Sequence, residues 1–147
     1  MYQLTSKPNW THSSATPPAR TTADRVAAVI VLAATVAATS WTLAVPALGV
    51  DLAVGEGDGS RTIGLVSVVV STLVAALVGW AALVLLGRWS RGRRTWAWAA
   101  ATLTVLSLVS PLTMADSAAA ALTLSAMHVA VAAVIVPGLL LATGSRR

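Results

Sequence analysis

The sequence predicts an all-α integral membrane protein, a four-helix bundle made of two transmembrane hairpins. Only 10% of the 147 residues are charged and 56% are hydrophobic, whereas a soluble domain carries about 25% charged residues. Four stretches contain no Asp, Glu, Lys or Arg, and each is long enough to cross a bilayer as a helix, which takes about 20 residues. Arg and Lys gather in alternate connecting segments, as expected of the loops on one side of a membrane.

The polar N-terminal segment, residues 1–24, lacks apolar periodicity and is rich in Ser, Thr and Pro. We expect it to be a disordered cytoplasmic tail. The first span is predicted at residues 26–50, and Pro46 near its far end predicts a kink or early unwinding. A cleaved signal peptide is the alternative, but the apolar run is longer than the roughly 7–15 residues of a signal core. An uncleaved anchor is therefore favoured.

A Gly-rich loop with three acids and one Arg, residues 51–62, follows the first span. Glu56, Asp58 and the glycines resemble a calcium loop only faintly, because their spacing does not fit the EF-hand pattern. A flexible acidic surface loop is the favoured interpretation. Asp51, and Asp116 in the later turn, could pair with Arg61, cap helix ends or form a shallow cation site, although exposed interfacial acids are usually solvated.

The second span is predicted at residues 63–87. Its Ala75 and Gly79 form a small-xxx-small pair that Ala76 extends, and such a surface lets two helices approach closely. Trp80 is expected to be a packing residue of this span.

An arginine-rich island, residues 88–94, separates the second span from a third at residues 95–114. Tryptophans cluster at headgroup depth, so three of them are expected to mark the membrane interface beside the arginines: Trp89, Trp96 and Trp98. The fourth span is predicted at residues 117–142, with a kink at Pro137 and Gly138. Residues 143–147 form the C-terminus.

The distribution of basic residues predicts the orientation. The segments expected inside the cell carry the topology-determining residues Arg25, Arg88, Arg91, Arg93, Arg94, Arg146 and Arg147. Because cytoplasmic loops collect Arg and Lys, both termini are expected in the cytoplasm and the protein in the plasma membrane. Pro46 precedes Asp51 by five residues, as Pro111 precedes Asp116. This echo could record a duplicated hairpin or two helices that end with common breaker residues.

His128 is the sharpest candidate for a functional residue, since ionisable groups deep in a membrane are rare and often functional. It lies roughly 20 Å down the fourth span if that span starts near residue 115. The hydroxyls expected at comparable depth are those of Thr102, Thr104, Thr35 and Thr39. His128 could serve a proton relay or a polar ligand site, or it could tie two helices together by a hydrogen bond. The structural role is favoured because no other charged residue lies in any span.

Catalysis and cofactor binding have no sequence support. The chain has no Cys, and no nucleophile–base pair, zinc motif or phosphate loop is present. We therefore expect no enzyme, no metal and no cofactor. The net charge of +5 is assigned to headgroup contacts rather than nucleic acid, because the basic residues flank apolar runs. The expected partners are the bilayer and its anionic headgroups near the arginine island, and a second copy or another membrane protein is a further candidate partner.

Two functions remain open from the sequence. The favoured one is a non-enzymatic structural, accessory or partner-binding membrane protein. The alternative is a small transporter or channel component that uses His128 in a polar path.

Four segments of the chain also resemble a known family: LGVDL at residues 48–52, VGWA at 78–81, SLVSPL at 107–112 and MHVAVAAVIVPG at 127–138. They resemble a family of small four-span membrane proteins that is commonest in high-GC Gram-positive bacteria and has no known function. The resemblance covers residues 25–141 and is most specific in the fourth span. It implies a plasma-membrane location and supplies no activity or site residue.

Overall fold

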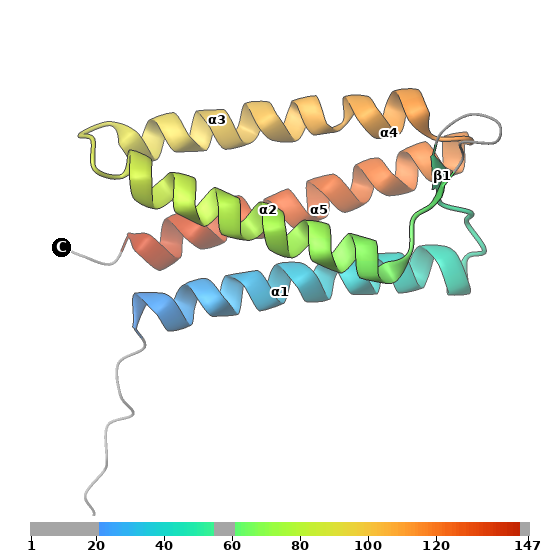
Figure 1. Ribbon diagram of the computed structural model, residues 1–147, viewed down its shortest axis with the longest axis horizontal. Helices are drawn as coiled ribbons and strands as arrows, with labels where there is room; N and C mark the ends of the chain where they lie inside the picture. The colour runs from blue at the N-terminus through green and yellow to red at the C-terminus, as the bar shows by residue number, and fades with distance from the viewer. Residues whose placement is uncertain (1–20, 55–60, 145–147) are drawn as a thin grey trace, which may run out of the picture.

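The computed structural model describes residues 21–54 and 61–144, in which four long helical segments lie side by side (Figure 1). The helices are α1 (Thr22–Thr42), α2 (Leu65–Leu86), α3 (Gly92–Ser107) with the short α4 (Val109–Met114) continuing it, and α5 (Ala118–Thr143). Four segments are long and apolar enough to cross a membrane: Thr22–Ala47, Leu65–Leu86, Gly92–Met114 and Ala118–Thr143. The all-α four-helix prediction is confirmed.

Helix α1 begins earlier than the sequence indicated. The Thr21 hydroxyl accepts a hydrogen bond from the Asp24 backbone N–H at 3.2 Å, and the Thr21 backbone N–H donates to the Asp24 carboxylate at 2.9 Å. This reciprocal capping box satisfies donors at the helix start. The predicted tail is therefore wrong for residues 22–24, and the rest of it, residues 1–20, lies outside the described residues.

Helix α1 widens into a π-helix, η1 (Leu43–Ala47), before it ends. Pro46 lies inside this segment, and its nitrogen has no N–H to donate to the preceding turn. The Leu48 backbone N–H donates to the carbonyl of Leu43, five residues earlier, at 3.0 Å, whereas an α-helix bonds to the carbonyl four residues earlier. Gly49 then takes a φ of +67°, which favours glycine. The early unwinding predicted at Pro46 is confirmed.

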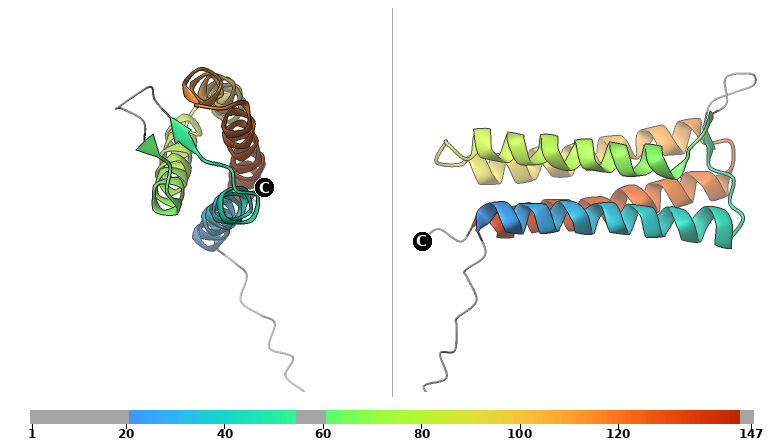
Figure 2. Two further views of the ribbon diagram at one scale, coloured as in Figure 1. Left: turned by 90° about the vertical axis from the view of Figure 1, so that its right-hand side faces the viewer. Right: turned by 60° about the horizontal axis from the view of Figure 1, so that its bottom comes forward.

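One end of the bundle, here called the strand end, carries β1 (Ala53–Val54) paired antiparallel with β2 (Arg61–Thr62). Val54 also bridges to Ala115 in the turn before α5, so this segment links both hairpins (Figure 2). Leu52 is fully buried there. The prediction of a flexible loop is thus wrong for its described ends, while Glu56, Asp58 and the calcium comparison fall in residues 55–60, outside the described part.

The opposite end, here called the arginine end, holds the α2–α3 turn, the start of α1 and the end of α5 (Figures 1 and 2). Helix α3 starts at Gly92, so Arg93 and Arg94 lie in its first turn. A Cβ on Gly92 would lie 1.6 Å from the Leu86 carbonyl oxygen, hence only glycine fits this turn. Arg93 donates to the Leu140 carbonyl at 2.6 Å, where its charge complements the C-terminal end of α5.

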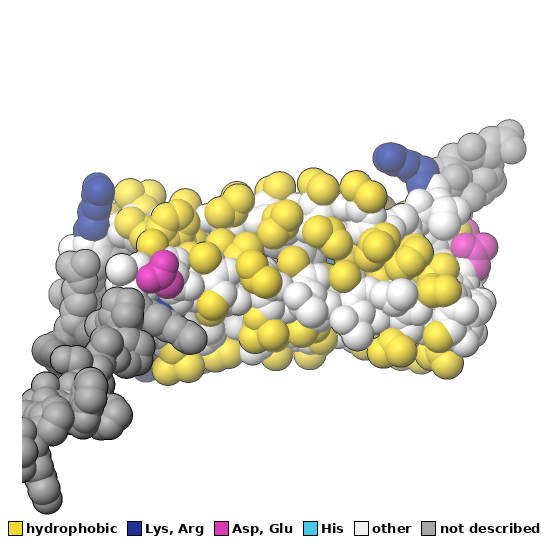
Figure 3. Space-filling model, turned by 90° about the horizontal axis from the view of Figure 1, so that it is seen from below, with side chains coloured by type: hydrophobic (Ala, Val, Ile, Leu, Met, Phe, Trp, Pro, Cys, Tyr) yellow, Lys and Arg dark blue, Asp and Glu magenta, His cyan; other side chains and the backbone are white. Residues whose placement is uncertain are grey.

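Helices α1 and α5 pack most closely. A Cβ on Gly138 of α5 would lie 2.8 Å from a Val29 methyl of α1, and Ala33 and Ala37 of α1 are buried. Helix α5 runs unbroken through Pro137 to Thr143. On the face that Figure 3 shows, yellow hydrophobic side chains predominate between the two charged ends, and in a membrane protein such a lateral face contacts lipid.

The tryptophans divide into two groups. Trp89 and Trp98 are exposed near the arginine end, as an interfacial role requires, and Trp80 is exposed on α2 rather than packed. Trp96 is buried, with 3% of its surface exposed, and its indole N–H donates to the Gly79 carbonyl at 2.9 Å. The prediction that Trp96 only marks the interface is therefore wrong, because this ring joins α3 to α2.

Candidate functional site

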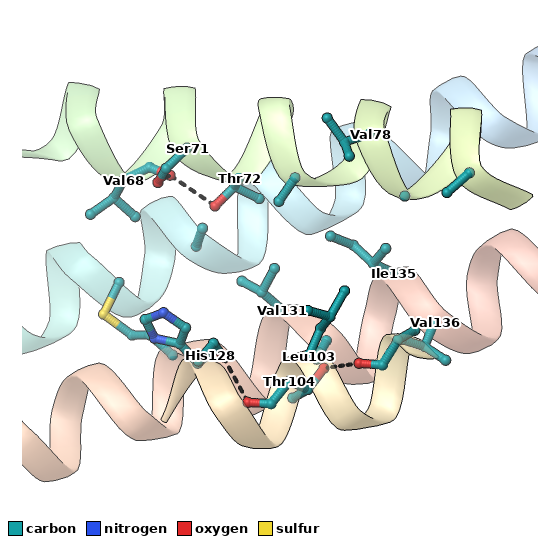
Figure 4. A pocket seen from close by; sticks show the side chains of 18 of the residues that line it. Val68, Ser71, Thr72, Val78, Leu103, Thr104, His128, Val131, Ile135 and Val136 are labelled. Atoms are coloured by element: carbon teal, nitrogen blue, oxygen red, sulfur yellow. Dashed lines mark hydrogen bonds between the residues drawn. The ribbon is translucent and has the colours of Figure 1, made fainter. Parts of the chain in front are cut away.

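A cavity of about 590 Å³ lies between α2 on one side and α3 and α5 on the other. Figure 4 shows Ser71 and Thr72 on the α2 wall, with His128 and Thr104 across the space from them. Pockets for small molecules usually measure roughly 300–1,000 Å³. The cavity is thus large enough to hold a small molecule.

The polar side chains of the cavity gather in its half nearer the strand end. They are Ser67, Ser71 and Thr72 of α2, Thr104 and Ser107 of α3, and His128 of α5. Helix α2 begins and α3 ends at the strand end, which explains why these residues lie in the same half of the cavity. His128 is the eleventh residue of α5, so it lies about 15 Å from that helix's first residue.

The half of the cavity nearer the arginine end is apolar. Its lining comprises Val78, Gly79, Ala82, Leu86, Trp96, Ala99, Ile135 and Val136. The polar N–H of Trp96 is already bonded to Gly79. The cavity therefore has two chemically distinct halves, and among the described residues no carboxylate, ammonium or guanidinium lines either of them.

His128 presents a hydrogen-bond acceptor to the cavity. Its Nδ1 lies 2.7 Å from the Leu124 carbonyl oxygen, and because a carbonyl can only accept, Nδ1 must carry the proton. In the neutral ring Nε2 then holds a lone pair, and the side chain is exposed where it lines the cavity. The described residues contain no hydrogen bond from His128 to another helix, so the favoured prediction that it ties helices together is wrong.

The neighbouring hydroxyls also act as acceptors toward the cavity. Thr72 and Ser71 donate to the Val68 carbonyl at 2.8 and 3.0 Å. Thr104 donates to the Ala100 carbonyl at 2.8 Å, and Ser107 donates to the Thr104 carbonyl at 2.7 Å. These bonds within each helix use the hydroxyl protons. The lone pairs of these hydroxyl oxygens can therefore accept hydrogen bonds from a ligand.

The structure brings together two of the five polar residues that the sequence singled out, His128 and Thr104. The other three, Thr102, Thr35 and Thr39, are exposed and do not line the cavity. Sequence reasoning missed the α2 hydroxyls. Ser67 and Ser71 lie four residues apart, with Thr72 adjacent, and this helical spacing places them on one face.

The small residues of α2 do not all serve close helix packing. Ala76 is fully buried in the core, whereas Ala75 is exposed and Gly79 half-buried, and both line the cavity. The predicted close approach holds at Gly79, where an added Cβ would lie 3.9 Å from atoms of Trp96 on α3 and of Leu139 on α5, whereas Ala75 is exposed and borders the cavity.

The acids at the strand end form no ion site in the part of the chain described. Asp51 and Asp116 make no ion pair with Arg61 among residues 21–54 and 61–144, and no group of three His, Asp or Glu side chains there could hold a metal. The Asp116 backbone N–H instead bonds to the Ala53 carbonyl at 3.4 Å. The cavity is the strongest candidate site.

Comparison with known proteins places the chain in a family. Residues 17–145 match the model of a family described as "Family of unknown function (DUF6069)". No match to a curated protein or to a solved structure was found. The chain belongs to the DUF6069 family.

Proposed function

We propose that this member of the DUF6069 family is a non-enzymatic, multi-pass protein of a bacterial cell membrane that acts by binding a molecule in the cavity between α2, α3 and α5. The carrying observation is a cavity of about 590 Å³ whose polar lining stops at His128 and whose remainder is apolar. A cavity with this lining can hold a molecule within the bilayer. Within the described part of the chain, the lining has no second titratable group that acid–base catalysis could use beside His128.

The proposed orientation has the arginine end in the cytoplasm. Arg25, Arg88, Arg91, Arg93 and Arg94 share that end, and cytoplasmic segments collect such residues. The arginines would contact anionic headgroups there. Single cysteines at Thr62 and Ser90, in a chain that has none, should react with a membrane-impermeant reagent from opposite sides of the membrane. Labelling of both from the same side contradicts this orientation.

Transport through a polar path is the alternative function. The exposed side chain of His128 and the hydroxyls at its depth favour it. The apolar half of the cavity opposes it, because a solute would have to cross the space beside Val78, Ile135 and Trp96 without a polar partner. Transport predicts pH-dependent solute flux in proteoliposomes that His128→Gln abolishes.

A photo-crosslinker tests the binding proposal. A benzophenone side chain at Val136, which is half-buried and lines the cavity, should capture a defined small molecule in living membranes, seen by mass spectrometry as one dominant adduct. The control position is Leu77, which is 49% exposed and lies outside the lining. It should capture the mixture of bulk phospholipids. The same mixture at both positions would overturn the proposal.

A further inference from the structure

We infer that the cavity takes up an uncharged amphipathic molecule from the bilayer, one apolar chain joined to a headgroup that carries hydrogen-bond donors. This inference rests on the proposed function and adds the chemical class of the ligand and its route of entry. Four features of the described residues support it: the absence of charge, the bias toward acceptors, the separation of polar and apolar halves, and the exposure of the lateral rims.

The lining excludes a charged headgroup. Among the described residues, none that lines the cavity is an Asp, Glu, Lys or Arg, and the His128 ring is bonded to the Leu124 carbonyl of its own helix. Moving an ion into such an apolar space without a counter-charge is very costly. A carboxylate, a phosphate or a quaternary ammonium would meet no partner of opposite charge.

The polar half selects hydrogen-bond donors. Thr72, Thr104 and Ser107 donate their hydroxyl hydrogens to carbonyls of their own helices, and in the neutral tautomer with a hydrogen on Nδ1 the Nε2 of His128 has a free lone pair. A ligand with hydroxyl or amide N–H groups can donate to these atoms. A ligand that only accepts finds no donor at Thr72, Thr104 or Ser107, whose hydroxyl hydrogens are already bonded to carbonyls.

The two halves set the ligand's orientation. The acceptors lie near the strand end, and the apolar lining of Val78, Ala82 and Ile135 extends from them toward Trp96 near the arginine end. A headgroup beside His128 therefore places its chain alongside α2 and α3. Burial of that chain supplies most of the attraction.

The exposed rims indicate entry from the side. Ala75 and Val78 on the α2 rim and Ala99 and Leu103 on the α3 rim are all exposed while lining the cavity. At the strand end, Leu52 is fully buried against the lining residues Val68 and Leu124. A molecule dissolved in the lipid therefore has direct access, whereas one in water meets the buried Leu52.

The experiment measures binding of four probes to the full chain in lipid nanodiscs. A monoacylglycerol should bind, since it has one chain and two donating hydroxyls. The fatty acid methyl ester with the same chain has no hydrogen-bond donor. It should bind about tenfold more weakly, which is the effect of roughly one lost hydrogen bond. The ionised fatty acid should bind still more weakly, and glycerol without a chain should not bind.

Matched variants test the site. His128→Leu and Thr72→Val, which remove acceptors, should each weaken monoacylglycerol binding about tenfold and leave methyl ester binding unchanged. Thr102→Val, outside the lining, should leave both unchanged. A third variant, His128→Gln, keeps an acceptor and should retain binding, so a folding defect in His128→Leu would not obscure the result.

The outcomes separate this inference from the proposed function. Equal binding of the monoacylglycerol and the methyl ester, or tighter binding of the fatty acid anion, overturns the inference while cavity binding stands. Binding of glycerol alone overturns entry from the lipid. Failure of every probe, together with bulk phospholipid adducts at Val136, overturns the proposed function itself.

Discussion

The α1–α5 side and the α2–α3 side of the bundle use small residues for opposite purposes. On the α1–α5 side, Gly138 and Ala33 let two helices touch, with no space for even a Cβ at Gly138. On the α2–α3 side, Ala75 and Ala99 are exposed and border the cavity. Where the opposite helix is close, a small side chain permits packing; where it diverges, the same side chain leaves volume.

The α1–α5 side is therefore expected to determine the stability of the bundle, and the α2–α3 side to determine ligand binding. Packing without voids stabilises a bundle, and the α1–α5 contact has that character. The α2–α3 side instead contains the cavity. Its two helices are joined by the turn at Gly92 and by the hydrogen bond from the Trp96 indole N–H to the Gly79 carbonyl. Substitutions on the two sides should therefore have unlike effects, which the following variants measure.

The largest effect is expected from Gly92→Ala at the turn that closes the α2–α3 side. The added Cβ would lie 1.6 Å from the Leu86 carbonyl oxygen, so the backbone must move. We expect a loss of about 3 kcal/mol or more in unfolding free energy, measured by unfolding in lipid bicelles. Gly64→Ala, with nothing within 4 Å of its added Cβ, is the control. Equal stability of the two variants would contradict the turn geometry.

Gly138→Leu should have the next largest effect, on the α1–α5 side. Its Cβ alone would meet the Val29 methyl groups at 2.8 and 2.9 Å, and over-packing costs roughly 1–3 kcal/mol. The same bicelle measurement applies. A companion Val29→Ala substitution should recover part of the loss, and additive losses in the double variant would show that the two residues do not touch.

Arg93→Met should lower stability by about 1 kcal/mol, because it removes bonds to the Leu140 carbonyl and the Thr143 hydroxyl at 2.6 and 2.8 Å from an exposed position. Arg94→Met is the matched control, since no hydrogen bond of the Arg94 side chain is recorded within residues 21–54 and 61–144. Thermal unfolding of both variants in one detergent gives the comparison. Identical midpoints would rule out the Arg93 contact.

Ala75→Leu should have the smallest effect on stability, under about 1 kcal/mol, because the larger side chain enters open cavity volume rather than packed protein. It should nevertheless abolish monoacylglycerol binding in nanodiscs. Ala81→Leu, exposed on α2 outside the lining, should bind normally. Undiminished binding by Ala75→Leu would show that the ligand lies elsewhere.

The sequence predicted the four helices because length and apolarity determine membrane spans almost by themselves. Pro46 likewise predicted the end of α1, since a missing N–H is a local property. The capping box at Thr21 was visible in principle but was missed, because polar residues before an apolar run resemble a tail. Leu52 and the small sheet depend on contacts across the bundle, which no local pattern reveals.

The candidate site was only partly predictable. His128 stood out because it is chemically unusual in a span, but its hydrogen bond to its own helix could not be distinguished from a bond to a neighbour. Ala75 and Gly79 fit a packing motif, and only the divergence of α2 from α3 shows that they border a cavity. Trp96 shared its sequence environment with Trp98, yet one ring is buried and the other exposed, a difference set by helix rotation.

The most direct test of the account is the nitrogen NMR spectrum of His128 in nanodiscs, in a chain whose other histidine has been replaced by His12→Ala. We expect a protonated Nδ1 and an unprotonated Nε2, with the Nε2 resonance moving when monoacylglycerol is added and staying fixed when the fatty acid methyl ester of the same chain is added. A proton on Nε2 in the free protein, or equal shifts with both probes, would contradict the claim that His128 offers an acceptor to a donor-bearing ligand.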